Sequence, residues 1–231
     1  MSSPTLTFTP AMFHASKSGL KDTTRRLAQV SRQNDIDQLA AAIAAEEEVA
    51  FWTTHTRLCP HQPGEIKPMV TTWAVSSIFD SAKPKELRSA NGNALQIWFN
   101  DGSDKPSWCG KSRPGRFLPK TLYALAPQVE ILTIHPEFLH DITEASARRE
   151  GISQITKDAL ERGDETVWKY GLADRDGLPG TDNFGWPWNQ WCRSARDAYL
   201  KLWDSINADR DEGQYAAAKN PAVWVITYRL I

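Results

Sequence analysis

The sequence predicts an α+β fold, in which five or six strands form a curled sheet or barrel with helices around them. Short segments rich in β-branched and aromatic residues recur along the chain, and they alternate with segments that have helical periodicity. The 231 residues contain no internal repeat and no linker-like stretch, so we expect a single domain over residues 1–231.

Strands are expected wherever β-branched and aromatic residues cluster. The C-terminal segment PAVWVITYRLI has this composition throughout, which predicts a strand in the middle of the sheet. The expected strands are residues 5–9, 49–55, 69–79, 95–100, the start of 128–140, and Val223 to Tyr228.

Helices are expected where the apolar spacing is helical and where capping residues mark the ends. Pro10 suits a first helical turn, and Gly19 suits the end of that helix. The predicted helices are residues 10–19, 33–46, a short helix from Asp141 or Thr143 to Gly151, 153–163, and the amphipathic segment 192–207. Two loop-rich stretches, 101–120 and 171–190, are long enough to be functional or disordered.

The charge is nearly balanced overall but is uneven along the chain. The net charge is −1, so nothing global marks a nucleic-acid-binding protein. Residues 14–32 and 105–120 are nevertheless both strongly basic. If the fold brings them together, they flank one cleft for an anionic ligand; otherwise they are two solvated loops.

Neither a metal centre nor a cofactor site is expected. Cys59, Cys109 and Cys192 are far apart in the sequence, and the pair Cys59 and His61 has no second pair to complete a zinc site. The N-terminal residues lack the pattern of a secretory leader, and no apolar run approaches the ~20 residues that span a bilayer. We therefore expect a cytoplasmic protein without a membrane partner.

Several segments, in order along the chain, resemble ASCH-domain proteins of the PUA-like superfamily, in the form typical of phage and prophage genomes. A G-x-K-x-x-T-x-R motif spans residues 19–26, and CPHQPGE is similar to the family's Cys-Pro…Pro-Gly-Asp turn. The similarity continues in residues 114–134, 140–152, 194–207 and 220–230, and two stretches, about 76–115 and 164–190, are insertions outside it. The resemblance implies a PUA-like curled β-barrel.

This sequence departs from the family pattern at two places. Asp22 follows Lys21, where phage relatives commonly have Thr. The stretch from Pro68 to Trp73 lacks the Arg and Glu of the family's Trp-Val-Arg-Glu-x-Trp motif. A ligand contact made by that Arg or Glu is therefore not expected here.

Some small ASCH proteins are amidohydrolases that remove the acetyl group of N4-acetylcytidine. The resemblance places their Lys, Thr and Glu on Lys21, Thr24 and Glu150 of this sequence. A Thr hydroxyl needs a neighbouring base to act as a nucleophile, and a buried Lys with a lowered pKa can serve as that base. A carboxylate can then carry the proton to the leaving amine. Each of the three residues could also have a purely structural role: Lys21 as a solvated surface lysine, Thr24 as a cap of the next turn, and Glu150 in a surface ion pair.

Cations and aromatic residues near this motif are candidates for ligand contacts. Arginines can bind phosphate oxygens, and tryptophans on a long loop can stack on a base or pin the loop to the core. The candidates are Arg25, Arg26, Arg113, Arg116, Trp186 and Trp188.

Three functions remain open from the sequence. The first is a binding module for RNA, a nucleotide or a modified base in a basic cleft, because PUA-like barrels commonly bind RNA. The second is an amidohydrolase acting on N4-acylated cytidine through Lys21, Thr24 and Glu150. The third is a phage accessory protein that acts through a host protein. We expect the side chains of Lys21, Thr24 and Glu150 to face one pocket under the first two.

Overall fold

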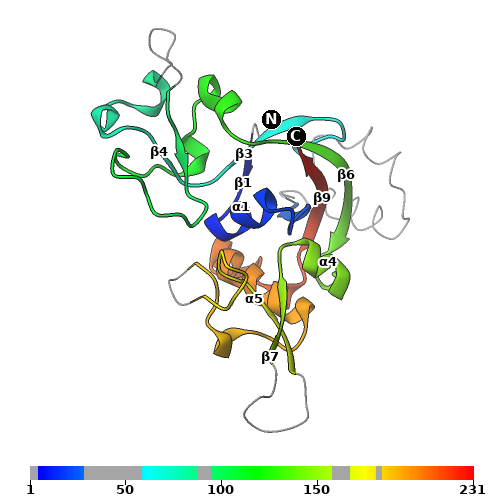
Figure 1. Cartoon of the computed structure of the whole chain (residues 1–231). Helices are drawn as coiled ribbons and strands as arrows, with labels where there is room; N and C mark the ends of the chain where they lie inside the picture. The colour runs from blue at the N-terminus through cyan, green and yellow to red at the C-terminus, as the bar shows by residue number, and fades with distance from the viewer. Residues whose placement is uncertain (1–4, 29–58, 88–94, 158–166, 181–183) are drawn as a thin grey trace.

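The computed structural model describes residues 5–28, 59–87, 95–157, 167–180 and 184–231. These residues form an α+β fold around a five-stranded mixed sheet with the strand order β1-β3-β6-β9-β2 (Figure 1), which confirms the expected fold class. The sheet strands are β1 (Leu6–Thr7), β2 (Thr23–Leu27), β3 (Ile66–Val70), β6 (Gln128–Phe138) and β9 (Ala222–Leu230).

Two further pairs of strands lie outside this sheet. They are β4 (Trp73–Ala74) with β5 (Trp98–Phe99), and β7 (Ser153–Lys157) with β8 (Val167–Gly171). The helices are α1 (Pro10–Lys17), α4 (Glu144–Arg149) and α5 (Ala195–Asn207). Short 3-10 helices are η1 (Ser77–Phe79), η2 (Pro84–Glu86), η3 (Gly115–Phe117), η4 (Lys120–Leu125), η5 (Leu139–Asp141), η6 (Trp188–Gln190), η7 (Arg210–Gly213) and η8 (Ala217–Lys219).

The sheet is open among the described strands. β1 and β2 are its two edges, β1 pairs with β3 in parallel, and every other pairing in the sheet is antiparallel. The register shifts between Ile131 and Thr133 of β6, and such an irregularity bends a strand. The expected closed barrel is therefore not formed by the described residues; they form an open sheet whose longest strand is irregular.

The C-terminal strand lies inside the sheet, as its sequence predicts. β9 pairs with β6 on one side and with β2 on the other. Val223, Trp224, Val225 and Ile226 are all buried, so both faces of the strand are covered. Four consecutive apolar residues are typical of a strand in such a position.

Two predicted helix signals are confirmed, Pro10 in the first turn of α1 and Thr143 as the cap of α4. Thr9 caps α1 by accepting a hydrogen bond from the Met12 amide, and Pro10 occupies the first turn. Thr143 caps α4, and Ser194 caps α5. The amides of Ala195 and Arg196, which open α5, also donate to the Glu144 carboxylate, so α4 fixes where α5 begins.

Some expected elements differ from those observed. The predicted helix over 153–163 is wrong in its described part, because Ser153–Lys157 is the strand β7, paired with β8. Ile155 and Thr156 are β-branched residues, which favour a strand. The partner strand β8 begins only at Val167, so the sequence around residues 153–157 does not indicate the pairing. The predicted strand 69–79 is broken after Val70, and the helix 33–46 and the strand 49–55 lie outside the described residues.

The core has two parts, which share contacts with Phe99. The larger part packs α1, α4 and α5 on the main sheet and is centred on Phe13, Met69, Ile134 and Trp224. The smaller part is formed by residues between Val70, at the end of β3, and Ala126. Most of them lie outside the main sheet, at the upper left of Figure 1. Its buried members are Val70, Trp73, Val75, Leu87, Leu118, Leu122 and Ala126. No helix in the described ranges is long and apolar enough to cross a membrane.

Candidate functional site

A cavity of about 320 Å³ opens where β2, the start of α1 and the last turns of α5 meet. Among the described strands β2 is an edge of the sheet, and four of its residues, Thr24, Arg25, Arg26 and Leu27, line the cavity. Lys21, Thr24 and Glu150 all line this cavity, although more than a hundred residues separate Glu150 from the other two. The structure thus brings the three predicted residues to one pocket.

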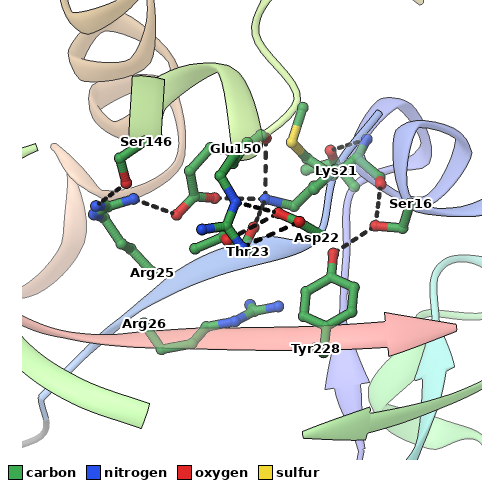
Figure 2. Close-up of polar contacts among 12 residues, drawn as sticks. Ser16, Lys21, Asp22, Thr23, Arg25, Arg26, Ser146, Glu150 and Tyr228 are labelled. Atoms are coloured by element: carbon green, nitrogen blue, oxygen red, sulfur yellow. Dashed lines mark hydrogen bonds and ion pairs between the residues drawn. The ribbon is translucent and has the colours of Figure 1, made fainter. Parts of the chain in front are cut away.

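Lys21 and Glu150 form a buried ion pair, shown in Figure 2. The Lys21 Nζ atom lies 2.5 Å from Glu150 Oε2, and both side chains are at most 3% exposed. Nζ also donates to the carbonyl oxygens of Thr23 at 2.6 Å and Glu150 at 3.0 Å. The two residues are held together through an isolated β-bridge between their backbones, so the pair is fixed by main-chain as well as side-chain contacts.

Arg25 extends this ion pair into a network. Its Nη1 atom donates to Glu150 Oε1 at 3.0 Å, its Nε atom to Glu137 Oε1 at 2.5 Å, and its Nη2 atom to Ser146 Oγ at 2.7 Å. The Arg25 side chain is 1% exposed and lies over the ring of Tyr199. Glu150 therefore accepts from two cations, and Arg25 reaches two carboxylates.

Arg26 lines the cavity and, like the exposed Arg210, forms no ion pair with a carboxylate among the described residues. Its Nη2 atom donates to the Thr7 carbonyl at 2.6 Å, and its guanidinium lies over the ring of Phe8. Its buried Nε atom has no hydrogen-bond partner within the part of the chain that the structure describes. Together with Lys21, Arg25 and Arg210, which also line the cavity, it gives four positive charges, and Glu137 and Glu150 give two negative ones. The positive charges at the cavity therefore exceed the negative ones.

Thr24 lies in the cavity wall but not where the sequence hypothesis requires its hydroxyl. It belongs to the strand β2 and pairs with Ile226, so Lys21 and Thr24 do not share the face of a helix, as their spacing of three residues would allow if the segment were helical. Thr24 is 5% exposed, and its hydroxyl makes no hydrogen bond to Lys21 or Glu150 in the structure. A rearrangement on ligand binding is needed before either group could activate it.

The pKa of Lys21 is lowered from its ordinary value. Burial is the largest cause, the nearby charges of Arg26 and Arg25 act in the same direction, and the Glu150 carboxylate opposes them. A lysine that loses its proton more easily than usual can accept one from a hydroxyl. The same arrangement also suits a purely binding role, since Lys21 and Glu150 fix each other's position.

The last turns of α5 supply the wall opposite β2, which sequence reasoning missed. Tyr199 and Trp203 are buried aromatic residues that line the cavity, and Asn207 and Arg210 continue the same wall. Trp203 donates its Nε1 hydrogen to the Tyr215 carbonyl, and Arg210 donates to Asn207 Oδ1. Tyr199, Trp203 and Asn207 are spaced four residues apart and so share one face of α5. This spacing could have indicated the wall, but aromatic residues on the apolar face of a helix are equally typical of a core.

Arg113 and Arg116 lie away from this cavity. Arg113 is buried over the Trp73 ring in the smaller core and donates to the Phe79 carbonyl. Arg116 is exposed and lies over the ring of its neighbour Phe117. None of residues 105–120 lines the cavity, so the expectation that both basic segments flank one cleft is wrong. Their separation follows from the smaller core, which holds Arg113 beside Trp73.

The two tryptophans of the long loop have different surroundings. Trp188 packs against Trp191 with Lys169 over its ring, and it lines none of the described cavities. Trp186 is half-buried against the larger core and lines a second groove next to the cavity. Only Trp186 is therefore placed to meet a ligand that extends beyond the cavity.

Within the described residues, no group of three or more His, Cys, Asp or Glu side chains could hold a metal ion. Cys59 and His61 are both buried, and the Nδ1 atom of His61 has no hydrogen-bond partner. Burial, followed by the charges of Lys67 and Arg26, lowers the pKa of His61 from 6.5 to about 4. His61 is therefore neutral in the folded protein at pH 7.

We expect His61 to make the folded state less stable in acid. The unfolded chain takes up a proton near pH 6.5, whereas the folded chain does so only near pH 4. The contribution of His61 to the free energy of unfolding is therefore fully present above pH 6.5. It falls by about 2–3 kcal/mol as the pH drops to 4. Urea unfolding at pH 7 and pH 4.5 measures this fall, and His61→Gln should reduce it. If the free energy of unfolding falls equally between pH 7 and pH 4.5 in the wild type and in His61→Gln, His61 is not the cause of the acid sensitivity.

Comparison of the chain with protein-family models, with curated proteins and with solved structures finds no match. The function must therefore be argued from the cavity itself.

Proposed function

We propose that the cavity binds a nucleotide, either free or as part of a single-stranded RNA. The observation that carries this proposal is Arg26, a cation at the cavity with an unpartnered Nε atom and no carboxylate among the described residues. An arginine in this state favours an anionic group that can accept its free hydrogens. A phosphate group has the required charge and geometry.

The rest of the cavity suits the base and sugar of the same ligand. Its volume of about 320 Å³ lies at the lower end of the range of small-molecule pockets, about 300–1,000 Å³. Phe8, Tyr199 and Trp203 supply aromatic surface, and Asn207 adds a polar group that can both donate and accept. Aromatic side chains beside cations are typical of sites that hold a single-stranded base and its phosphate.

We also propose that the chain is an ASCH-type member of the PUA-like superfamily. The support is that the G-x-K-x-x-T-x-R motif supplies Lys21, Thr24 and Arg26 to the cavity, and that the distant Glu150 joins them there. The proposal includes the PUA-like barrel of that superfamily, whereas the described strands form an open sheet. RNA and nucleotides are then the expected partners by analogy of fold.

Calorimetric titration with 5′-CMP and with cytidine tests the phosphate contact. CMP should bind the wild type at least about tenfold more tightly than cytidine, because a charge-assisted hydrogen bond contributes about 1.5–3 kcal/mol. Arg26→Met should remove this difference while leaving cytidine binding little changed. Arg26 has no carboxylate to leave behind among the described residues, so the variant should fold normally.

The matched control for this titration is Arg116→Met, which removes an exposed arginine outside the cavity. It should keep the preference for CMP. If the wild type binds neither ligand, or if Arg26→Met keeps the full preference for CMP, the proposal is wrong.

The second candidate function is an amidohydrolase that acts on N4-acylated cytidine. The presence of Lys21, Glu150 and Thr24 in one cavity favours it. In this reaction the proton shared by Lys21 and Glu150 first moves to Glu150, which leaves Lys21 neutral. The Thr24 hydroxyl then attacks the acetyl carbon and gives its proton to Lys21, and Glu150 donates its proton to N4 as the C–N bond breaks. Water then hydrolyses the Thr24 ester and releases acetate. The separation of the Thr24 hydroxyl from both groups in the present structure places this function second.

Chromatography of N4-acetylcytidine after incubation with the protein tests this second function. If it holds, the wild type forms cytidine and acetate, and Thr24→Val lowers the rate by at least about 100-fold. Thr24→Val is the suitable variant because it keeps the side-chain shape and breaks no hydrogen bond to Lys21 or Glu150. An unchanged rate in Thr24→Val excludes Thr24 as nucleophile, and absence of both binding and turnover favours a protein partner.

A further inference from the structure

A second groove of about 550 Å³ adjoins the cavity. The two share Thr9 at the cap of α1 and Leu202 and Ile206 of α5, so they are separated by a common wall rather than by the core. Ile206 is 46% exposed, so its side chain presents apolar surface on the wall between the two hollows. A ligand that leaves the cavity over Ile206 enters this groove.

The groove presents two aromatic side chains, Phe184 and Trp186. Gly102, which has a φ of +83°, seats the Phe184 ring, because a β-carbon on residue 102 would lie 2.2 Å from the ring. Trp186 packs against the larger core, and Lys201 Nζ lies 4.7 Å from the centre of its ring. Both rings are half-buried, so each is held in place and keeps exposed surface for a ligand.

The junction between the two hollows suits an anion. Thr9, Pro10 and Ala11 line the groove, and Thr7, Phe8, Thr9 and Met12 line the cavity, so the first turn of α1 lies between them. The N-terminus of a helix favours negative charge. Arg26 is bound to the Thr7 carbonyl and lies over Phe8, which brings its unpartnered Nε atom to the same place.

From this geometry we propose that the site takes two adjacent nucleotides of a single strand rather than one free nucleotide. One base occupies the cavity, the phosphodiester lies at the junction near Arg26 and the start of α1, and the second base stacks in the groove against Trp186 or Phe184. This inference rests on the proposed nucleotide-binding function and names the length of its ligand. Stacking on an aromatic side chain is tolerant of base identity, so no sequence preference is required in the groove.

Titration with CpC and with 3′-CMP tests the second subsite, because 3′-CMP has the first nucleoside and the phosphate but no second base. CpC should bind roughly 5- to 100-fold more tightly than 3′-CMP, the range that stacking of one base gives. Ser205→Glu places a carboxylate in the groove from an exposed position on α5 and should bring CpC to the affinity of 3′-CMP. Affinity for 3′-CMP itself should stay unchanged.

Trp186→Leu should act on CpC in the same direction and gives a second, apolar test of the groove. The control is Ser81→Glu, a change at an exposed serine that lines none of the described cavities. Equal binding of CpC and 3′-CMP by the wild type overturns the second subsite alone and leaves the nucleotide site standing. Binding of neither ligand overturns both proposals, and full CpC affinity in Ser205→Glu and Trp186→Leu overturns the groove as its location.

Discussion

Glu150→Ala is expected to lower the free energy of unfolding by about 3–5 kcal/mol, the usual effect of removing one partner from a buried ion pair. The change leaves the ammonium of Lys21 without a carboxylate in a site where the side chain is 2% exposed. It also takes one of two carboxylates from Arg25, which keeps Glu137. Urea unfolding at pH 7 measures the loss, and the same experiment shows whether the variant still folds.

Two further variants separate the charge of this pair from its packing. Glu150→Gln keeps a hydrogen-bond acceptor for Lys21 without the charge and should lie between the wild type and Glu150→Ala. The double variant Lys21→Met with Glu150→Leu removes both charges together and should recover most of the lost stability, because apolar replacements of a buried pair are often neutral or stabilising. A Glu150→Ala variant within about 1 kcal/mol of the wild type would show that the pair is not buried as described.

Arg26→Glu is expected to weaken binding of a ten-nucleotide single-stranded RNA by about 100-fold at low salt, because it removes one phosphate contact and adds a repulsive charge. The dependence of the logarithm of affinity on the logarithm of salt concentration should also become flatter, by about one to two. Fluorescence anisotropy of labelled RNA at several salt concentrations between 50 and 200 mM measures both effects.

Arg116→Glu makes the same change of charge at an exposed arginine outside the cavity. It should lower the RNA affinity by less than about threefold, because Arg116 does not line the cavity and interactions between exposed charges are weakened by salt. Equal losses in the two variants would mean that RNA responds to net charge rather than to the cavity. Circular dichroism of both variants confirms that the comparison is between folded proteins.

Local patterns in the sequence predicted some of the elements that frame the site, but they did not predict the strand β2, which carries Thr24, Arg25 and Arg26. The composition of residues 223–228 predicted an internal strand, and Thr143, one of the two expected caps, lies where α4 begins. The meeting of Lys21 with Glu150 was predicted from the family resemblance alone, since no local pattern connects residues 129 positions apart. Pairing across such distances depends on the whole topology.

The parts that could not be predicted depend on packing between distant segments. Arg113 was expected at a basic cleft, but Trp73 offers it a buried aromatic face, and no charge pattern shows such a partner. Tyr199 and Trp203 look the same in sequence whether they pack in a core or line a cavity. β7 was mistaken for a helix because its partner β8 lies beyond residue 166.

A crystal structure of the protein with 5′-CMP tests the nucleotide site most directly. The phosphate should lie within hydrogen-bond distance of Arg26 Nε, with the base between β2 and the aromatic wall of Tyr199 and Trp203 and with the Lys21–Glu150 pair still formed. An unchanged cavity at millimolar CMP, or CMP bound elsewhere on the molecule, would contradict the proposed function.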